Sequence, residues 1–302
     1  MINGIINIYK TPGFTSHDVV AKMRGICGQK KIGHTGTLDP QATGVLPVCL
    51  GSATKVCDML TDRDKEYVAE LLLGVKTDTQ DTTGCVLETS IVGGETFSVE
   101  RITEAIMGFM GSYEQLPPMY SAVKVNGKKL YELAREGREV ERRTRTVTIH
   151  DLEILEIHLP VVKFRVECSK GTYIRTLCAD IGEKLSCGGA MQSLVRTKAG
   201  GFLLEDAITL DELQKLKDAG RLKEAVMPVD SVFSVYPALH VSGEGRKLLE
   251  NGNPFMPEQT LEGEVFAAGQ WVRIYREDNS FAAIYAYDAP QRCYKPVKMF
   301  LG

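Results

Sequence analysis

The sequence is poor in tryptophan, with one among 302 residues, and no apolar run approaches the length of about 20 residues that a membrane helix needs. Its first residues, MINGIINIYKTPGF, lack the basic start, the long apolar stretch and the small-residue cleavage site of a signal peptide. We therefore expect a cytoplasmic protein that does not associate with a membrane.

Signatures of metal and cofactor chemistry are also missing. None of the eight cysteines forms a CxxC pair, and the five histidines do not cluster with them, so the pattern is typical of buried, reduced thiols. There is no P-loop, no dinucleotide fingerprint and no GxSxG elbow. An enzyme with this sequence is expected to work with side chains alone, without a metal or a cofactor.

Basic residues are concentrated in short segments, although the formal net charge of the chain is −3. Residues 124–145 carry eight lysines and arginines against four glutamates, a local net charge of +4. Residues 22–31 and the tail from residue 291 carry basic side chains and no acidic ones. Such segments either bind a polyanion or form solvated surfaces, and composition alone leaves both interpretations open.

The pattern of the first 232 residues favours an α+β domain. Apolar runs and alternation predict strands at 4–8, 45–50, 67–73, 146–157 and 161–168. Helical spacing predicts helices that follow Thr15, Ser98, Tyr173 and Thr209. Strands and helices do not alternate regularly, so we expect a mixed, mainly antiparallel sheet with flanking helices.

The last seventy or so residues differ in composition, and we place a domain boundary there, giving domains at 1–232 and 233–302. After a short helix at 242–250, the sequence predicts short strands at 263–268, 271–276, 281–287 and 293–300. Short strands at this even spacing are typical of a small, closed or nearly closed β module.

Three side chains in this sequence could carry chemistry. Asp39 lies in a loop rich in glycine and proline, where an aspartate is usually a turn residue. Arg175 lies in the first turn of a predicted helix, which is unfavourable with the helix dipole, so it either has a carboxylate partner such as Asp39 or is a surface arginine. Tyr67 begins an apolar strand and is suited either to the core or to stacking on a base.

A family resemblance connects these residues. The segment GHTGTLDPQATGVLP at 33–47 closely resembles the signature of the TruB family, the tRNA pseudouridine-55 synthases. More of the family pattern follows in order, at 64–84, 116–137, 169–182 and 194–202. The segment from 233 to 302 more weakly resembles the small β-barrel-like module of the PUA type that the family often carries.

The resemblance implies roles for individual residues. Asp39 would be the catalytic carboxylate, Arg175 would pair with it, and Tyr67 would stack on the uracil and remove its C5 proton. Tyr173 would stand beside Arg175, Leu194 would line the pocket, and His34 would fill the gap that the departing uridine leaves in the RNA loop. An insertion at about 116–146 would grip the T-arm of tRNA through Lys124, Lys128, Lys129, Arg142 and Arg143.

The implied function is isomerisation of uridine 55 in the T-loop of tRNA to pseudouridine, by a monomer that needs no guide RNA, metal or cofactor. The flipped base would rejoin the ribose through C5. Three routes stay open for Asp39: attack on C6 of the base, attack on C1′ of the ribose, or a glycal route. Alternative functions are a tRNA-binding chaperone, a guide-RNA-dependent synthase subunit and an enzyme acting on a small molecule.

Overall fold

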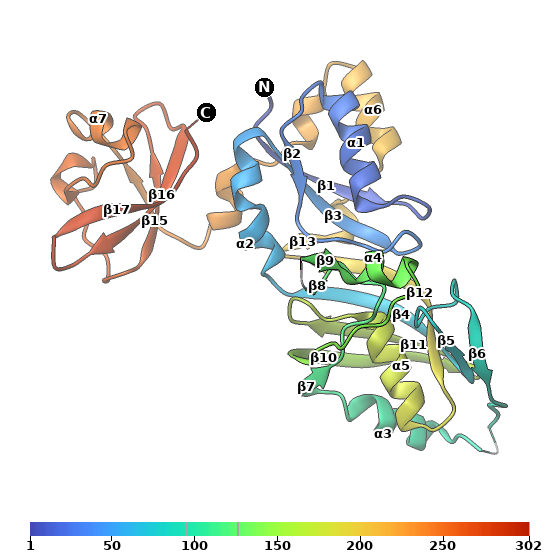
Figure 1. Cartoon of the computed structure of the whole chain (residues 1–302). Coiled ribbons are helices and arrows are strands. Elements are labelled where there is room, and N and C mark those ends of the chain that lie inside the picture. The colour runs from blue at the N-terminus through green and yellow to red at the C-terminus, as the bar shows by residue number, and fades with distance from the viewer. Residues whose placement is uncertain (95, 126, 302) are drawn as a thin grey trace.

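The computed structural model describes residues 1–94, 96–125 and 127–301, and its largest element is a nine-stranded sheet (Figure 1). Seven strands follow one another across it in the order β1-β3-β12-β4-β11-β10-β7, while β2 and β13 join at the sides. The strands are β1 (Gly4–Lys10), β2 (Ile32–His34), β3 (Thr43–Leu50), β4 (Lys65–Leu73), β7 (Gly111–Gln115), β10 (Arg145–His158), β11 (Val161–Cys168), β12 (Gly189–Ala199) and β13 (Phe202–Leu203).

Antiparallel pairing dominates this sheet, as the sequence predicts. The exception among the described strands of this sheet is β12, which runs parallel to β3 at Val195↔Thr43 and antiparallel to β4. Gly44 permits this junction: it has a φ of 101°, and a side chain there would meet the Arg196 carbonyl oxygen at 2.2 Å. The loop that precedes β3 is thereby fixed against β12 and β4.

Helices cover the sheet in separate groups. The helices are α1 (Ser16–Cys27), α2 (Cys57–Thr61), α3 (Val99–Met107), α4 (Leu130–Arg135), α5 (Ile174–Lys184) and α6 (Leu210–Asp218), with 3-10 turns η1 (Gly51–Val56), η2 (Leu204–Asp206), η3 (Leu222–Ala225) and η4 (Val229–Phe233). Figure 1 shows α1 beside α6 at one end of the sheet and α3 beside α5 at the other. No helix in the described ranges is long and apolar enough to cross a membrane.

All four predicted helix starts are confirmed, and three of them have side-chain caps. Thr15 and Asp18 form a capping box before α1, Ser98 caps α3, and Thr209 and Glu212 form a second capping box before α6. These side chains satisfy backbone amides that have no partner within the helix, so the start of each helix is defined locally.

Alternation along β4 and β11 separates an inner face from an outer one. In both strands every second side chain is buried, and in β11 these are the predicted Val162, Phe164, Val166 and Cys168. On the outer face Arg165 makes ion pairs with Glu66, Asp151 and Glu153. The inner face packs on α3 and α5 and forms the core that also contains Tyr67 and Leu194.

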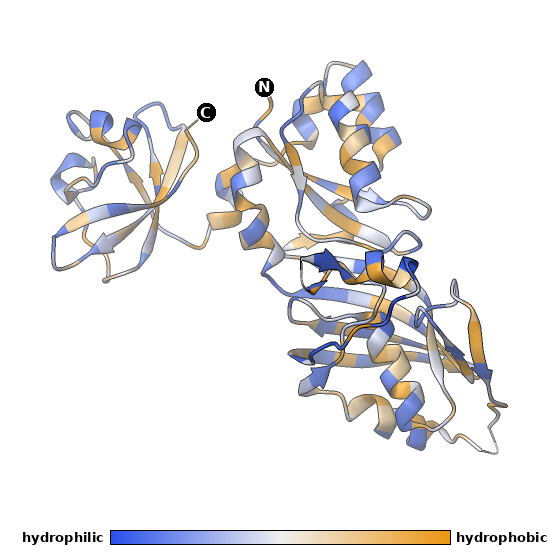
Figure 2. Cartoon of the chain, viewed as in Figure 1, coloured by the Kyte–Doolittle hydropathy of each residue, from blue (hydrophilic) through white to orange (hydrophobic). Residues whose placement is uncertain are grey.

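Two hairpins project from the body. One consists of β5 (Val75–Thr77) and β6 (Val86–Thr89), and the turn between these strands lies beside α5. The other, β8 (Lys124–Val125) with β9 (Lys128–Lys129), belongs to the predicted insertion and leads into α4. Figure 2 shows β9 in the blue of hydrophilic residues, as its two lysines require.

The C-terminal β module that the sequence predicts is present as a four-stranded sheet, which is not closed into a barrel. Its elements are β14 (Ala238–His240), α7 (Gly245–Glu250), η5 (Pro257–Gln259), β15 (Trp271–Tyr275), β16 (Phe281–Asp288) and β17 (Cys293–Met299). Single bridges, Val241↔Thr260 and Phe255↔Tyr294, connect the segment around η5 to both edges of the sheet. This irregular segment covers the edges without closing a barrel.

The prediction of a strand at 263–268 is wrong, because that segment is irregular. Gly263 has a φ of 61°, which turns the chain, and the Val265 side chain is exposed. The segment is held instead by the Tyr294 hydroxyl, which donates to the Glu264 carbonyl at 2.8 Å. Apolar residues at strand spacing therefore do not form a strand here, because no neighbouring strand pairs with the segment.

The module is joined to the large sheet through shared core residues. Phe233 at the end of η4 packs against Phe281 and Phe300 of the module, and these rings belong to one core cluster with Ile5 of β1. In addition, the Tyr275 hydroxyl donates to Asp230 at 2.7 Å. The C-terminal module is therefore attached to the nine-stranded sheet by packed side chains as well as by the chain connection.

Candidate active site

Asp39 lies in the loop between β2 and β3, and contacts on both of its sides fix the position of that loop. Leu38 is buried in the main core, and its backbone amide donates to the Ser16 hydroxyl at 2.9 Å. The Pro40 carbonyl accepts from the Gly13 amide at 2.9 Å and from the Lys10 ammonium at 3.0 Å. The backbone of Asp39 is therefore held by β1 and by the start of α1.

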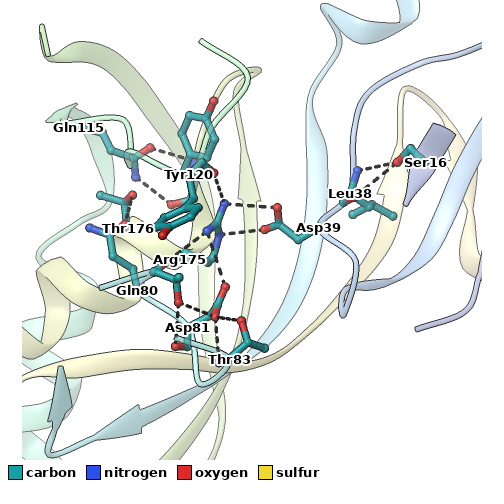
Figure 3. Close-up of polar contacts among 12 residues, drawn as sticks. Ser16, Leu38, Asp39, Gln80, Asp81, Thr83, Gln115, Tyr120, Arg175 and Thr176 are labelled. Carbon is teal, nitrogen blue, oxygen red and sulfur yellow. Dashed lines mark hydrogen bonds and ion pairs between the residues drawn. The ribbon is translucent and has the colours of Figure 1, made fainter. Parts of the chain in front are cut away.

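Arg175 of α5 binds both carboxylate oxygens of Asp39 (Figure 3). Its Nε lies 2.9 Å from Oδ2, and its Nη2 donates to Oδ1 at 3.3 Å. The Arg175 side chain is 6% exposed, whereas the Asp39 side chain is 37% exposed. The pair expected from the sequence is present, and its carboxylate is the member that a ligand can reach.

Three further groups from two other segments hold Arg175. Its Nη1 donates to the Thr79 carbonyl at 3.1 Å and lies 3.6 Å from the Asp81 carboxylate, in the turn between β5 and β6. Its Nη2 also donates to the Tyr120 carbonyl at 2.9 Å, at the start of the insertion. Figure 3 shows Asp39, Asp81 and Tyr120 around the Arg175 guanidinium. This set of acceptors explains why an arginine is tolerated in a buried position.

Burial affects the pKa of Asp39 more than its arginine partner does. Burial raises the pKa of Asp39 above its ordinary value, and the neighbouring Asp81 charge acts in the same direction. The Arg175 and Lys10 charges lower that pKa but do not outweigh burial. The pKa of Asp39 therefore lies closer to neutral pH than that of an exposed aspartate.

Two other buried cations support the same loop. Lys10 is fully buried, and burial lowers its pKa to about 8. Arg196 of β12 is 1% exposed, and it donates to the carbonyls of Val45 at 2.7 Å and Gly36 at 3.3 Å. Both cations bind backbone carbonyls on either side of Asp39, so they fix the loop and add positive charge beneath the site.

Tyr67 and Leu194 line the inner face next to this loop. Tyr67 lies in β4, 8% exposed, in the core cluster that also contains Leu38, Ala42 and Leu194. Arg196 is its partner in the β12–β4 pairing. Burial raises the pKa of the Tyr67 hydroxyl, while the Arg196 charge and hydrogen bond lower it. An aromatic ring and an aliphatic wall are therefore present beside the carboxylate.

Tyr173 lies two residues before Arg175 in the sequence, and His34 lies five residues before Asp39. Tyr173 precedes α5, and the Gln115 side chain both accepts from its amide at 2.7 Å and donates to its carbonyl at 3.0 Å. Its ring lies 5.8 Å from the Arg145 guanidinium. His34 ends β2 and contacts the His17 ring edge-on at 5.4 Å, and burial lowers its pKa. A neutral His34 ring is thus favoured at neutral pH.

The basic candidates of the insertion are held mainly within it. Lys128 pairs with Glu136 at 3.3 Å, the Lys129 ammonium lies 5.3 Å from the Tyr131 ring, and Arg142 donates to the Pro117 carbonyl at 3.0 Å. Lys124 and Arg143 are exposed. The insertion reaches Asp39 indirectly, through the hydrogen bond between Arg175 and the Tyr120 carbonyl.

Together these groups present a partly exposed carboxylate that is fixed by a buried guanidinium and bordered by an aromatic ring. Such a carboxylate can act as a nucleophile toward a flat, electron-poor ring or a sugar carbon. The apolar wall of Tyr67 and Leu194 suits a base that has left its stack.

Comparison with known proteins decides the family. A family model described as the N-terminal domain of the TruB family pseudouridylate synthases matches residues 24–174, which is half of the chain. A second model, the tRNA pseudouridylate synthase B C-terminal domain, matches residues 175–234. The chain belongs to the TruB family. It is therefore a pseudouridine synthase, an isomerase, as the resemblance implied.

Relatives in the TruB family match along nearly the whole length of the chain. The chain is 51% identical to tRNA pseudouridine synthase B of Lachnoclostridium phytofermentans over 310 aligned positions, covering 99% of this chain and 100% of the relative. It is 42% identical to the protein of the same name from Bacillus pumilus, covering 99% and 98%.

Solved structures agree with this fold. The chain resembles a protein of an H/ACA RNP bound to a substrate RNA containing 2′-deoxyuridine, with a TM-score of 0.72 and 27% identity over 99% of this chain and 85% of that chain. The likeness to a Cbf5-Nop10-Gar1 complex has the same TM-score and coverage, with 29% identity.

Three residues of the TruB site were missed by the sequence analysis. Arg196 could have been found, because it is two residues beyond Leu194 on a strand and so shares its inward face. Asp81 lies in a polar turn where nothing in the pattern separates it from Asp78. Lys10 follows an apolar strand and resembles an ordinary strand end.

Proposed function

We propose that this protein isomerises uridine 55 in the T-loop of tRNA to pseudouridine, and that Asp39 is the reacting carboxylate. The observation that carries this proposal is the geometry of Asp39, whose two oxygens are bound by a nearly buried Arg175 while the carboxylate stays open to a ligand. The name of the relatives, tRNA pseudouridine synthase B, supports tRNA as the substrate.

The reaction requires no electron transfer. The bond between N1 of uracil and C1′ of the ribose breaks, and a bond between C5 and C1′ forms. C5 then loses its proton and N1 gains one, so the base is isomerised without net loss of any atom. Attack on C6, attack on C1′ and the glycal route each need an ionised Asp39, which Arg175 and Lys10 favour.

The neighbouring side chains have complementary roles in this proposal. Tyr67 stacks on the flipped uracil against Leu194. To accept the C5 proton Tyr67 must first be a phenolate, and the Arg196 charge favours that form. Tyr173 supports Arg175, and the neutral ring of His34 fills the gap in the RNA loop. Filling that gap offsets part of the few kcal/mol that base flipping costs.

We assign residues 1–232 to the catalytic domain and residues 233–302 to a PUA-like RNA-binding module. Two separate sheets support this division. Within the first domain, the insertion at 116–146 grips the T-arm through Lys124, Lys128, Lys129, Arg142 and Arg143. In this proposal the protein is a monomer in the cytoplasm. It acts without a guide RNA, because it is more similar to the tRNA enzymes than to the proteins of the H/ACA complexes.

The test uses the purified protein and an Asp39→Asn variant with an unmodified tRNA transcript, in the absence of guide RNA. Pseudouridine is then mapped along the tRNA by chemical labelling. We expect the wild-type protein to modify one uridine of the T-loop, and the variant to bind tRNA without reacting. If the wild-type protein binds tRNA and leaves every uridine unchanged, the proposal fails.

A further inference from the structure

Gln80 has an unusual backbone conformation close to the reacting pair. Its φ is 65°, in the left-handed region that is unfavourable for a residue with a Cβ atom. Such conformations persist where surrounding contacts impose them, and they concentrate at functional sites. Gln80 lies in the turn between β5 and β6, with Thr79 and Asp81 on either side.

Contacts from two elements hold Gln80 in this conformation. Its side-chain Oε1 accepts from the Thr176 hydroxyl at 2.7 Å, and Thr176 is 2% exposed in α5. Its backbone carbonyl accepts from the Met191 amide of β12 at 3.0 Å. The turn is thus fastened to the helix by a side chain and to the sheet by its backbone, as Figure 3 shows for the contact with Thr176.

The residues that adjoin Gln80 and Thr176 in the sequence also contact each other. Thr79 and Asp81 direct a carbonyl and a carboxylate at Arg175, which directly precedes Thr176 in α5. Asp81 is oriented within the turn, since its Oδ1 accepts from the Thr83 amide at 2.9 Å and from the Thr79 hydroxyl at 2.8 Å. The hydrogen bond between Gln80 and Thr176 therefore sets the distance between the turn and the guanidinium.

We infer that Gln80 and Thr176 are positioning residues for catalysis: their hydrogen bond fixes the turn against α5, so that Thr79 and Asp81 hold Arg175 in the orientation that binds both oxygens of Asp39. This inference rests on the proposed role of Asp39. Neither residue touches the substrate in this scheme. A guanidinium that is free to tilt would lose one of its two bonds to Asp39, and a small misplacement is costly in catalysis.

The charged groups that face Asp39 give the inference a specific signature. These are Arg175 from α5, Asp81 from the turn and Lys10 from β1. Arg175 favours the ionised carboxylate and Asp81 disfavours it. Loosening Arg175 therefore moves the acid limb of the rate profile to higher pH, a change that a purely structural role of Gln80 would not produce.

The experiment compares Thr176→Val, Thr176→Ser, Gln80→Gly and the Thr176→Val/Gln80→Gly double variant in the full-length protein. Valine removes the hydroxyl at constant shape, serine keeps it, and glycine adopts the left-handed conformation without strain. Thr61→Val serves as a matched control, because Thr61 donates a 2.8 Å hydrogen bond to the Cys57 carbonyl in α2. The measurements are the single-turnover rate on tRNA as a function of pH, the Kd for tRNA and the melting temperature.

We expect Thr176→Val and Gln80→Gly each to lower the single-turnover rate about 10- to 100-fold, with an acid limb at higher pH and an unchanged Kd. The double variant should resemble either single variant, because both remove the same hydrogen bond. Thr176→Ser should restore the rate, and Thr61→Val should keep it.

Wild-type rates and acid limbs in folded Thr176→Val and Gln80→Gly would overturn the inference, even if their melting temperatures fall. So would additive effects in the double variant. An Asp39→Asn variant measured in parallel separates the two proposals: if it stays active, the proposed role of Asp39 fails, and if it is inactive while Thr176→Val is normal, the positioning role alone fails.

Discussion

Arg196 lies directly opposite Tyr67 in the antiparallel pairing of β12 with β4, and it is 1% exposed. A cation in this position connects the ring at the bottom of the site to the loop that carries Asp39, because its guanidinium also binds the Val45 and Gly36 carbonyls. The loop and the ring are consequently held by one side chain, and their relative position depends on it.

Replacing Arg196 tests this connection. Arg196→Met keeps much of the volume but leaves the Val45 and Gly36 carbonyls without their donor, at about 1–3 kcal/mol for each buried group. We expect a lower free energy of unfolding in urea and a lower single-turnover rate. Arg196→Lys should recover little of either, since an ammonium cannot reproduce the planar fork. Full activity of Arg196→Lys would contradict the geometry.

The pH dependence of the reaction follows from the environment of Asp39. Burial raises its pKa, so the carboxylate gains a proton at a higher pH than an exposed aspartate would. We expect the single-turnover rate to fall, as pH decreases, through a midpoint above the ordinary aspartate value of 3.8. Arg175 lowers this pKa, so the residual rate of an Arg175→Gln variant should have its midpoint at a still higher pH. An unchanged midpoint in that variant would contradict the assignment of the limb to Asp39.

Asp81→Asn should move the same midpoint in the opposite direction. The asparagine keeps the shape of the side chain and an acceptor for the Thr83 amide, but it removes a negative charge that raises the pKa of Asp39. Arg175 retains the Thr79 and Tyr120 carbonyls, and the hydrogen bond between Gln80 and Thr176 still fixes the turn, so the guanidinium keeps its orientation. The measurement is the single-turnover rate as a function of pH, compared with that of Thr176→Val. A midpoint shifted to higher pH in both variants would show that Asp81 acts only by holding Arg175.

Part of this site is predictable from sequence because its signals are local. The pairing of Arg175 with Asp39 is suggested by an arginine in a first helical turn, where the helix dipole disfavours a cation without a partner. The alternation of β11 and the capping boxes likewise depend only on nearby residues. These features do not depend on how distant parts of the chain fold.

Other features depend on partners that are distant in sequence. Lys10 is buried because the Pro40 carbonyl accepts from it, and nothing near Lys10 in the sequence reveals that acceptor. The open C-terminal sheet has a similar origin, since strand periodicity predicts strands but not which edges they join. The irregular segment at 263–268 shows the same limitation, because Val265 has strand-like spacing and no neighbouring strand.

The last prediction concerns the basic insertion and separates binding from chemistry. Lys124 and Arg143 are exposed, and Lys124 lies on the β8–β9 hairpin. If they contact phosphates of the T-arm, Lys124→Gln and Arg143→Gln should each weaken tRNA binding and reduce the slope of log K against log salt by about one. The single-turnover rate at saturating tRNA should stay unchanged, because neither residue reaches Asp39.

The control for this prediction is an arginine outside the insertion, Arg221, which forms an ion pair with Glu224 at 2.7 Å. Arg221→Gln should leave both the affinity and the salt slope unaltered, since its charge is already paired on the surface. If the insertion variants match Arg221→Gln in both measurements, the T-arm is gripped elsewhere. If instead they lower the saturated rate while the slope stays constant, the insertion acts by closing over the site, through the hydrogen bond between the Tyr120 carbonyl and Arg175, rather than by holding phosphates.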